Sequence, residues 1–111
     1  MNHRLTVSSA LAAALALGLA APAASDATVA KGPPASAALC FSCHGPDGNP
    51  LTRDYPILKG QQRDYLVAAL GAYRAAERTG SPNAQAMAAI AKGLTDAEIA
   101  ELANWFAMVR R

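Results

Sequence analysis

The pentapeptide Cys40-Phe41-Ser42-Cys43-His44 constrains this chain more than any other feature. It has the C-x-x-C-H pattern by which a protein attaches haem covalently, with each thiol adding to one vinyl group. The histidine that follows is then placed to bind the iron from one side. The chain contains two cysteines, and this motif uses both of them. The sequence therefore predicts one covalently attached haem c, bound through Cys40 and Cys43 with His44 as an iron ligand.

The first residues have the pattern of a secretory signal peptide. Arg4 supplies a positive charge, and an Ala- and Leu-rich run at 10–24 follows it. This run is too short for a membrane span, which needs about 20 apolar residues. An uncleaved N-terminal anchor is the alternative. We expect residues 1–23 to be removed on export to the periplasm, residues 24–34 to form a linker, and residues 35–111 to form one haem-carrying domain.

Charge and composition exclude several classes of function. Ten Lys and Arg face eight Asp and Glu, which gives a formal net charge of +2, and these charges form no basic stripe. We therefore expect no nucleic-acid partner. No segment after the N-terminal run could span a bilayer, so we expect no stable membrane insertion. Redox proteins that recognise local surface patches are the expected partners, with a flavoprotein or a terminal oxidase as candidates.

The spacing of apolar residues predicts an all-α fold. A short helix at 35–41 ends in the C-x-x-C-H motif, and a loop rich in turn-forming residues continues to Gly60. The next segment has apolar residues at i, i+3, i+4 and i+7, as in an amphipathic helix, and turn formers at 79–83 end it. A short apolar segment at 84–91 precedes a terminal helix, which a capping box from Thr95 to Glu98 opens. No segment alternates with the period of a strand.

Met87 is the candidate for the second axial ligand of the iron. Met1 would leave with the signal peptide, and Met108 lies within the terminal helix. A thioether favours ferrous iron, so His/Met ligation raises the reduction potential relative to two imidazoles. Two imidazoles from one chain are excluded, because His44 is the only histidine after the signal peptide. The alternative is that Met87 is a flexible filler of the core.

Together, these residues resemble the small bacterial class I cytochromes c, in particular the single-haem type similar to one half of the di-haem cytochromes c. The resemblance extends over nearly the whole expected mature chain. Its fold would be about four short helices and loops wrapped around one covalent haem. Three segments carry the resemblance: Cys40-x-x-Cys43-His44-Gly45 with Asp47-Gly48, then Tyr55-Pro56-Ile57-Leu58-Lys59-Gly60-Gln61, then Met87-x-x-Ile90-Ala91 before Leu94-Thr95-Asp96.

The resemblance implies roles for two further residues. Pro56, twelve residues after His44, would offer its carbonyl to the second ring nitrogen of that ligand. Such a bond fixes the tautomer and the orientation of an imidazole. Leu58 would pack on the face of the haem. No residue stands out as the partner of the haem propionates, and the candidates are Arg53, Lys59, Gln61 and Arg63.

The function that these features favour is that of a periplasmic one-electron carrier. With both axial positions filled, the iron has no open site for a substrate, so we expect no enzymatic turnover. The main alternative is the haem-bearing electron-transfer subunit of a larger dehydrogenase, such as a flavocytochrome sulfide dehydrogenase. A thiol–disulfide oxidoreductase would leave His44 without a purpose and needs strands that the pattern lacks. A zinc site lacks a fourth ligand. A gas sensor needs a vacant site on the iron, so Met87 could then not be an iron ligand.

Overall fold

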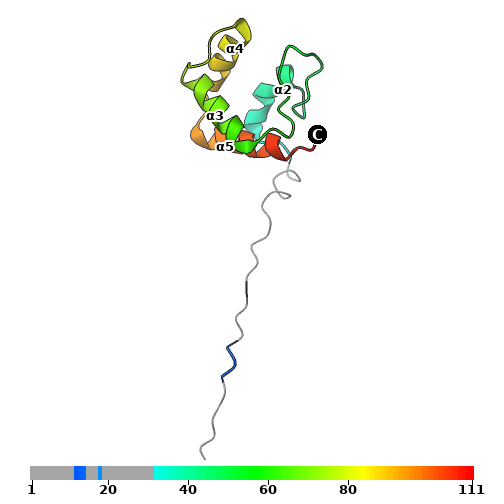
Figure 1. Cartoon of the computed structure of the whole chain (residues 1–111), viewed down its shortest axis with the longest axis vertical. Coiled ribbons are helices and arrows are strands. Elements are labelled where there is room, and N and C mark those ends of the chain that lie inside the picture. Colours follow the sequence, from blue (N-terminus) through cyan, green and yellow to red (C-terminus); the bar gives the residue numbers. More distant parts are fainter. Residues whose placement is uncertain (1–11, 15–17, 19–31) are drawn as a thin grey trace, which may run out of the picture.

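Short helices connected by loops make up the part of the chain that the computed structural model describes, which is residues 12–14, 18 and 32–111. Within these ranges the elements are the 3₁₀ turn η1 (Ala35–Ala37) and the helices α2 (Ala38–His44), α3 (Arg63–Arg74), α4 (Pro82–Ala91) and α5 (Asp96–Met108). The expected all-α fold with about four helices is therefore confirmed (Figure 1). Most of the expected signal peptide and most of the expected linker lie outside the described residues. None of the helices described is long and apolar enough to cross a membrane.

Helix α3 ends earlier than the apolar spacing predicts, at Arg74 instead of near residue 79. Ala76 takes a left-handed conformation, with φ of 57°. The N–H of Ala76 donates to the carbonyl of Tyr73, and the N–H of Glu77 donates to that of Ala72. This pair of bonds is a Schellman motif, which terminates a helix and usually has glycine at the left-handed position. The end of α3 could not be predicted from the sequence, because an alanine occupies the position where glycine is usual.

The starts of the last two helices follow local capping signals. Helix α4 begins at Pro82, two residues before the predicted apolar segment. The hydroxyl of Ser81 accepts a hydrogen bond from the N–H of Ala84 at 3.1 Å, and proline is favoured at the first helical position. At α5, the hydroxyl of Thr95 accepts from the N–H of Glu98, and the Glu98 carboxylate accepts from the N–H of Thr95, both at 3.1 Å. The predicted capping box is confirmed.

Helix α5 lies along the base of the domain in Figure 1. Its buried face contacts both η1 and α3. Ala37 of η1 is completely buried, and its small side chain allows the close approach to α5. Helix α4 packs on α3. The core is formed by the residues Ala37, Leu66, Ala91, Leu94, Ile99, Leu102, Ala103, Trp105 and Phe106.

The loop between α2 and α3 is closed on itself by backbone hydrogen bonds. The carbonyl of Gly48 accepts from the N–H of Leu58 at 2.9 Å and from the N–H of Lys59 at 3.0 Å. Gly48 has a φ of 81°, and a Cβ there would lie 2.8 Å from the Lys59 nitrogen, so a side chain is not tolerated. The Lys59 ammonium donates to the Asp47 carboxylate at 3.0 Å and holds the pKa of Asp47 below its ordinary value. These contacts fix the position of Pro56 within the loop.

Candidate functional site

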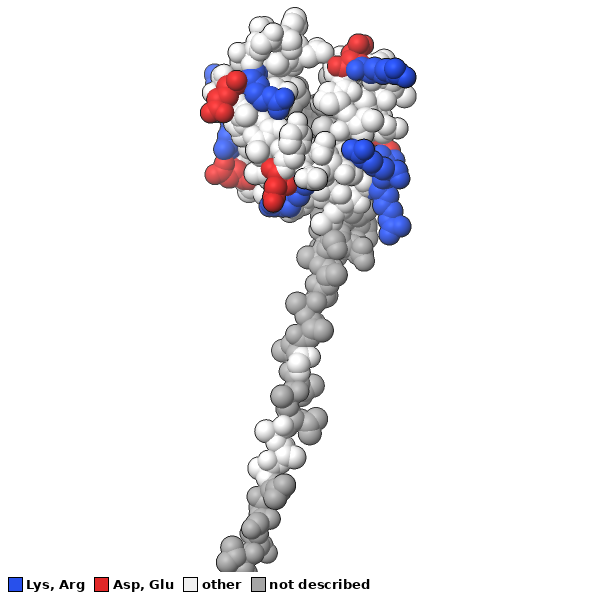
Figure 2. Space-filling view, in the orientation of Figure 1, with Lys and Arg blue, Asp and Glu red and all other residues white. Residues whose placement is uncertain are grey.

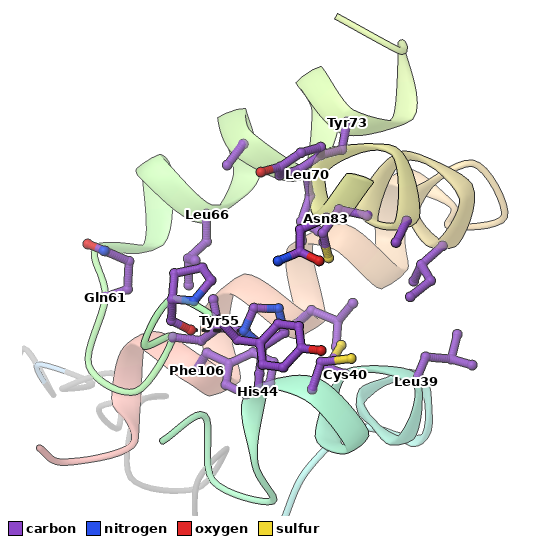
Figure 3. Close-up of a pocket in the computed structure, with 18 of the residues that line it drawn as sticks. Leu39, Cys40, His44, Tyr55, Gln61, Leu66, Leu70, Tyr73, Asn83 and Phe106 are labelled. Carbon is purple, nitrogen blue, oxygen red and sulfur yellow. Dashed lines mark hydrogen bonds between the residues drawn. The ribbon is translucent and has the colours of Figure 1, made fainter. Parts of the chain in front are cut away.

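A cavity of about 370 Å³ lies between α2, the loop that follows it, α3 and α4. Such a volume is within the range of small-molecule sites, about 300 to 1,000 Å³. Its walls are mainly apolar, and Leu66 and Leu70 from α3 and Phe106 from α5 contribute to them (Figure 3). The space-filling view shows charged side chains scattered around a largely uncharged face (Figure 2). The cavity therefore suits a bulky apolar group better than a small polar substrate.

The side chains of the C-x-x-C-H motif line one side of this cavity. Cys40, Cys43 and His44 stand at i, i+3 and i+4 of α2, which places them on one helix face. Both cysteines are free thiols. Burial raises the pKa of the Cys40 thiol, so at neutral pH it is protonated. This is the opposite of the lowered pKa by which thiol–disulfide oxidoreductases keep a reactive thiolate, and it argues against that alternative.

The imidazole of His44 is buried and held in one orientation. Its Nδ1 lies 2.9 Å from the carbonyl oxygen of Pro56. A carbonyl can only accept, so in the neutral imidazole Nδ1 carries the proton and Nε2 has the lone pair. The ring of Tyr55 packs edge-on at 6.2 Å between centroids. The structure thus contains the hydrogen bond that the resemblance implied, and it leaves Nε2 available as a donor to a metal.

The two remaining predicted residues come from other elements. Met87 lies on α4, is partly buried and lines the cavity, whereas Met108 near the end of α5 does not line it. Leu58 lines the cavity from the loop and packs against the core. The fold therefore brings to one cavity all six residues that the sequence analysis singled out, namely Cys40, Cys43, His44, Pro56, Leu58 and Met87.

The structure separates the four candidates for the haem propionates. Gln61 lines the cavity, but the other three do not. The ammonium of Lys59 is bonded to Asp47, and the guanidinium of Arg63 is bonded to Asp64 at 3.0 Å. Among the described residues, only Gln61 of the four is thus placed to reach a group bound in the cavity.

Arg78 is a cavity residue that the sequence analysis missed. It is the one Lys or Arg among the cavity-lining residues in the described ranges. Its guanidinium carbon lies 4.7 Å from the centroid of the Tyr73 ring, a cation–π contact that positions the side chain. The apolar spacing predicts a helix that continues to the turn formers at 79–83 and so includes Arg78. Because α3 ends at Arg74, Arg78 instead follows the turn and lines the cavity.

The sequence matches the model of a known protein family, and this model covers most of the chain. Residues 29–109 match the model of the family described as cytochrome c. The chain belongs to the cytochrome c family. The expected resemblance to class I c-type cytochromes is confirmed, and so is the expected cofactor, because members of this family carry covalent haem c.

Three relatives show how far the similarity extends. Cytochrome c-554(548) of Halomonas halodenitrificans is 43% identical over 67 residues, which cover 60% of this chain and 80% of the relative. The thiosulfate dehydrogenase electron acceptor of Stutzerimonas stutzeri is 40% identical over 70 residues, which cover 63% of this chain and 32% of the relative. Cytochrome c4 of Azotobacter vinelandii is 34% identical over 99 residues, which cover 83% of this chain and 46% of the relative. The cytochrome thus spans less than half of the length of the last two relatives.

The cavity residues fit a covalent haem. Two thiols lie beside an imidazole whose Nε2 is free, and a thioether lines the same cavity from α4. Apolar side chains surround the space that a porphyrin would fill, and the guanidinium of Arg78 provides a positive charge for carboxylates. Electron transfer, the function of this family, requires no other group.

Proposed function

We propose that this cytochrome is a periplasmic one-electron carrier whose single haem c is attached to Cys40 and Cys43 and ligated by His44 and Met87. The observation that carries the proposal is the hydrogen bond between His44 Nδ1 and the Pro56 carbonyl, 2.9 Å long. It directs the lone pair of His44 Nε2 away from the loop in a cavity that both thiols line. If His44 only filled the core, nothing would require two thiols and a methionine to line the same cavity.

The surrounding side chains have distinct roles in this proposal. When bound, the haem supplies an iron that exchanges one electron between its ferrous and ferric states. The Pro56 carbonyl makes His44 a stronger and better oriented donor. Met87 would bind the iron from α4 and, as a soft ligand, would favour the ferrous state. With both His44 and Met87 bound, the iron would offer a substrate no coordination site, so the chain would act as a carrier and not as an enzyme.

Two polar side chains of the cavity are assigned to the haem carboxylates. Arg78 supplies a guanidinium that can donate two parallel hydrogen bonds to one carboxylate. Gln61 supplies an uncharged amide donor on the same cavity. A charge partner inside the site lowers the cost of burying a propionate. Leu58 adds apolar wall near His44, which keeps water from the iron.

A second candidate function is supported by the names of two relatives. The proteins of Stutzerimonas stutzeri and Thiomonas intermedia are called thiosulfate dehydrogenase electron acceptors. Their names favour a dehydrogenase as the electron donor of this chain. If the chain bound such a donor stably, it would be the haem-bearing subunit of a complex such as a flavocytochrome sulfide dehydrogenase. Purification of the tagged holoprotein at physiological ionic strength distinguishes the two. A stoichiometric flavoprotein in the eluate would support the subunit, and its absence the free carrier.

Export and haem attachment are tested together by intact mass and absorbance of protein secreted from a maturation-competent host. We expect the mass of the chain without about its first 23 residues, plus one haem. The Cys40→Ala/Cys43→Ala variant is expected to carry no covalent haem. A full haem complement in that variant would contradict the attachment site, and an unprocessed mass would contradict export.

Met87 is tested against Met108, the other methionine of the domain. Replacing Met87 with Ala should abolish the weak far-red charge-transfer band of ferric His/Met haem and lower the reduction potential, because the soft thioether is lost. Met108→Ala is the matched control and should leave both unchanged, since this side chain does not line the cavity. An unchanged spectrum of Met87→Ala would show that another group holds the sixth position.

A further inference from the structure

Asn83 makes a side-chain hydrogen bond to another residue that lines the cavity. Its amide nitrogen donates to the backbone carbonyl of Asp54 at 3.3 Å, which joins positions 29 residues apart. Both residues line the cavity, and Figure 3 shows the amide of Asn83 projecting toward it from α4. Asn83 precedes Met87 by four residues on α4, so the two side chains share a helix face. The bond therefore fastens the helix that carries the proposed sulfur ligand.

The acceptor belongs to the same short segment that orients His44. Asp54 accepts from Asn83, and Pro56, two residues later, accepts from the His44 ring at 2.9 Å. Between them, Tyr55 packs edge-on against the His44 ring. A continuous connection thus runs from the imidazole, through residues 54–56, to the first turn of α4 and on to Met87. It joins the two sides of the cavity without passing through the space between them.

Among the described helices, α4 packs mainly on one neighbour. Its main packing partner is α3, while α2 is packed mainly on η1. In the described part of the chain, the Asn83–Asp54 bond is the one side-chain hydrogen bond that connects α4 with the loop between α2 and α3. This contact therefore links the two ligand-bearing segments directly.

We propose that Asn83 is a positioning residue that holds Met87 in its binding position by tying α4 to the segment that orients His44. The proposal rests on the proposed function, in which Met87 is the sixth ligand. Loss of the bond would allow the first turn of α4 to move away from the loop. The fraction of molecules in which the sulfur has left the iron would then rise, although the haem stays attached.

Imidazole added to the ferric holoprotein measures this fraction, because it binds only when the sixth position is free. A typical hydrogen bond changes an equilibrium constant by about two- to ten-fold. Asn83→Ala should therefore bind imidazole about two- to ten-fold more tightly than the parent protein and show a weaker far-red band. The matched control is Gln85→Ala, which removes a similar bond, 3.2 Å long, from an amide of the same helix to the Thr79 carbonyl. This variant should bind imidazole like the parent, because Gln85 does not line the cavity.

Asn83→Asp separates positioning from a simple effect on helix stability. A carboxylate in the first turn of α4 interacts favourably with the helix dipole, so it should stabilise the helix. It cannot donate to the Asp54 carbonyl. The proposal therefore expects Asn83→Asp to bind imidazole as tightly as Asn83→Ala. If Asn83 serves only to stabilise the helix, Asn83→Asp would instead resemble the parent protein, and the proposal would be overturned.

The outcomes also separate this proposal from the function on which it rests. A parent protein that has no far-red band, or that keeps it in Met87→Ala, refutes Met87 ligation itself. A parent protein that has the band and loses it in Met87→Ala, with unchanged imidazole binding in Asn83→Ala, refutes the role of Asn83 alone. Circular dichroism of each variant verifies that the haem-loaded protein is folded.

Discussion

At the scale of single residues, the site depends on which polar side chains reach the cavity. Lys59 and Arg63 are engaged with neighbouring carboxylates, whereas Arg78 rests on the ring of Tyr73 and lines the cavity. Arg78 is itself exposed, so water partly screens its charge, but it is the one Lys or Arg that lines the cavity in the described residues. Among the Lys and Arg residues of the described ranges, Arg78 is therefore the one placed to influence an iron bound there.

Replacing Arg78 with Gln should lower the reduction potential by on the order of tens of millivolts. A nearby positive charge favours the ferrous state, which has one more electron, so its removal favours the ferric state. The control is Arg53→Gln, which removes the same charge from an exposed position that does not line the cavity. Redox titration of both holoproteins measures the effect. Equal shifts in the two variants would contradict a specific role for Arg78.

At the scale of elements, helix boundaries decide what the cavity contains. The Schellman motif at Ala76 ends α3 and releases Arg78 from the helix. The cap at Ser81 starts α4 so that Asn83 lies in its first turn and Met87 one turn later. The capping box at Thr95 starts α5, which packs against η1 and α3, after the buried Leu94. Each boundary rests on one or two hydrogen bonds of ordinary strength.

Thr95→Ala should lower the free energy of unfolding of the holoprotein by about 1 kcal/mol, the usual cost of losing an N-cap hydroxyl. The matched control is Thr52→Ala in the exposed part of the loop, which should change it by less than about 0.5 kcal/mol. Urea denaturation monitored by circular dichroism gives both values. Equal effects of the two substitutions would show that the capping box contributes little to α5.

At the scale of the whole molecule, the core and the cofactor site are continuous. Leu66, Leu102 and Phe106 belong to the buried core and also line the cavity. The helices that carry the two proposed iron ligands are held mainly through other elements, α2 by η1 and α4 by α3. A domain of this size has a small core and is marginally stable without additional links. The haem therefore completes the core as well as the site.

The Cys40→Ser/Cys43→Ser variant, produced without covalent haem, should be less stable than the holoprotein by several kcal/mol. Without the porphyrin, the apolar cavity walls are exposed to water, and α2 and α4 lose the group that both would contact. Thermal melts followed by far-ultraviolet circular dichroism should show a broader transition at a lower temperature. Ser42→Ala is the control, because it changes the same motif outside the cavity and should retain haem. Equal melting of the two variants would contradict this coupling.

The sequence alone determined the features that neighbouring residues encode. The C-x-x-C-H motif, the capping box at Thr95 and the helical spacing can be recognised because the interacting groups are at most a few residues apart. Met87 could be named as the candidate ligand because the chain offers few soft or imidazole ligands. These patterns, together with the resemblance, gave the all-α fold and the cofactor correctly.

Only the tertiary structure decided which groups meet across the cavity. The acceptors for His44 and Asn83 are backbone carbonyls, which every residue has, so no side chain marks them; the one at Pro56 was expected only from the resemblance. The end of α3 depends on an alanine in a conformation that its identity does not favour, and the place of Arg78 follows from that end. Contacts between residues far apart in the chain depend on how the helices pack, because packing, and not local propensity, sets the distances between them.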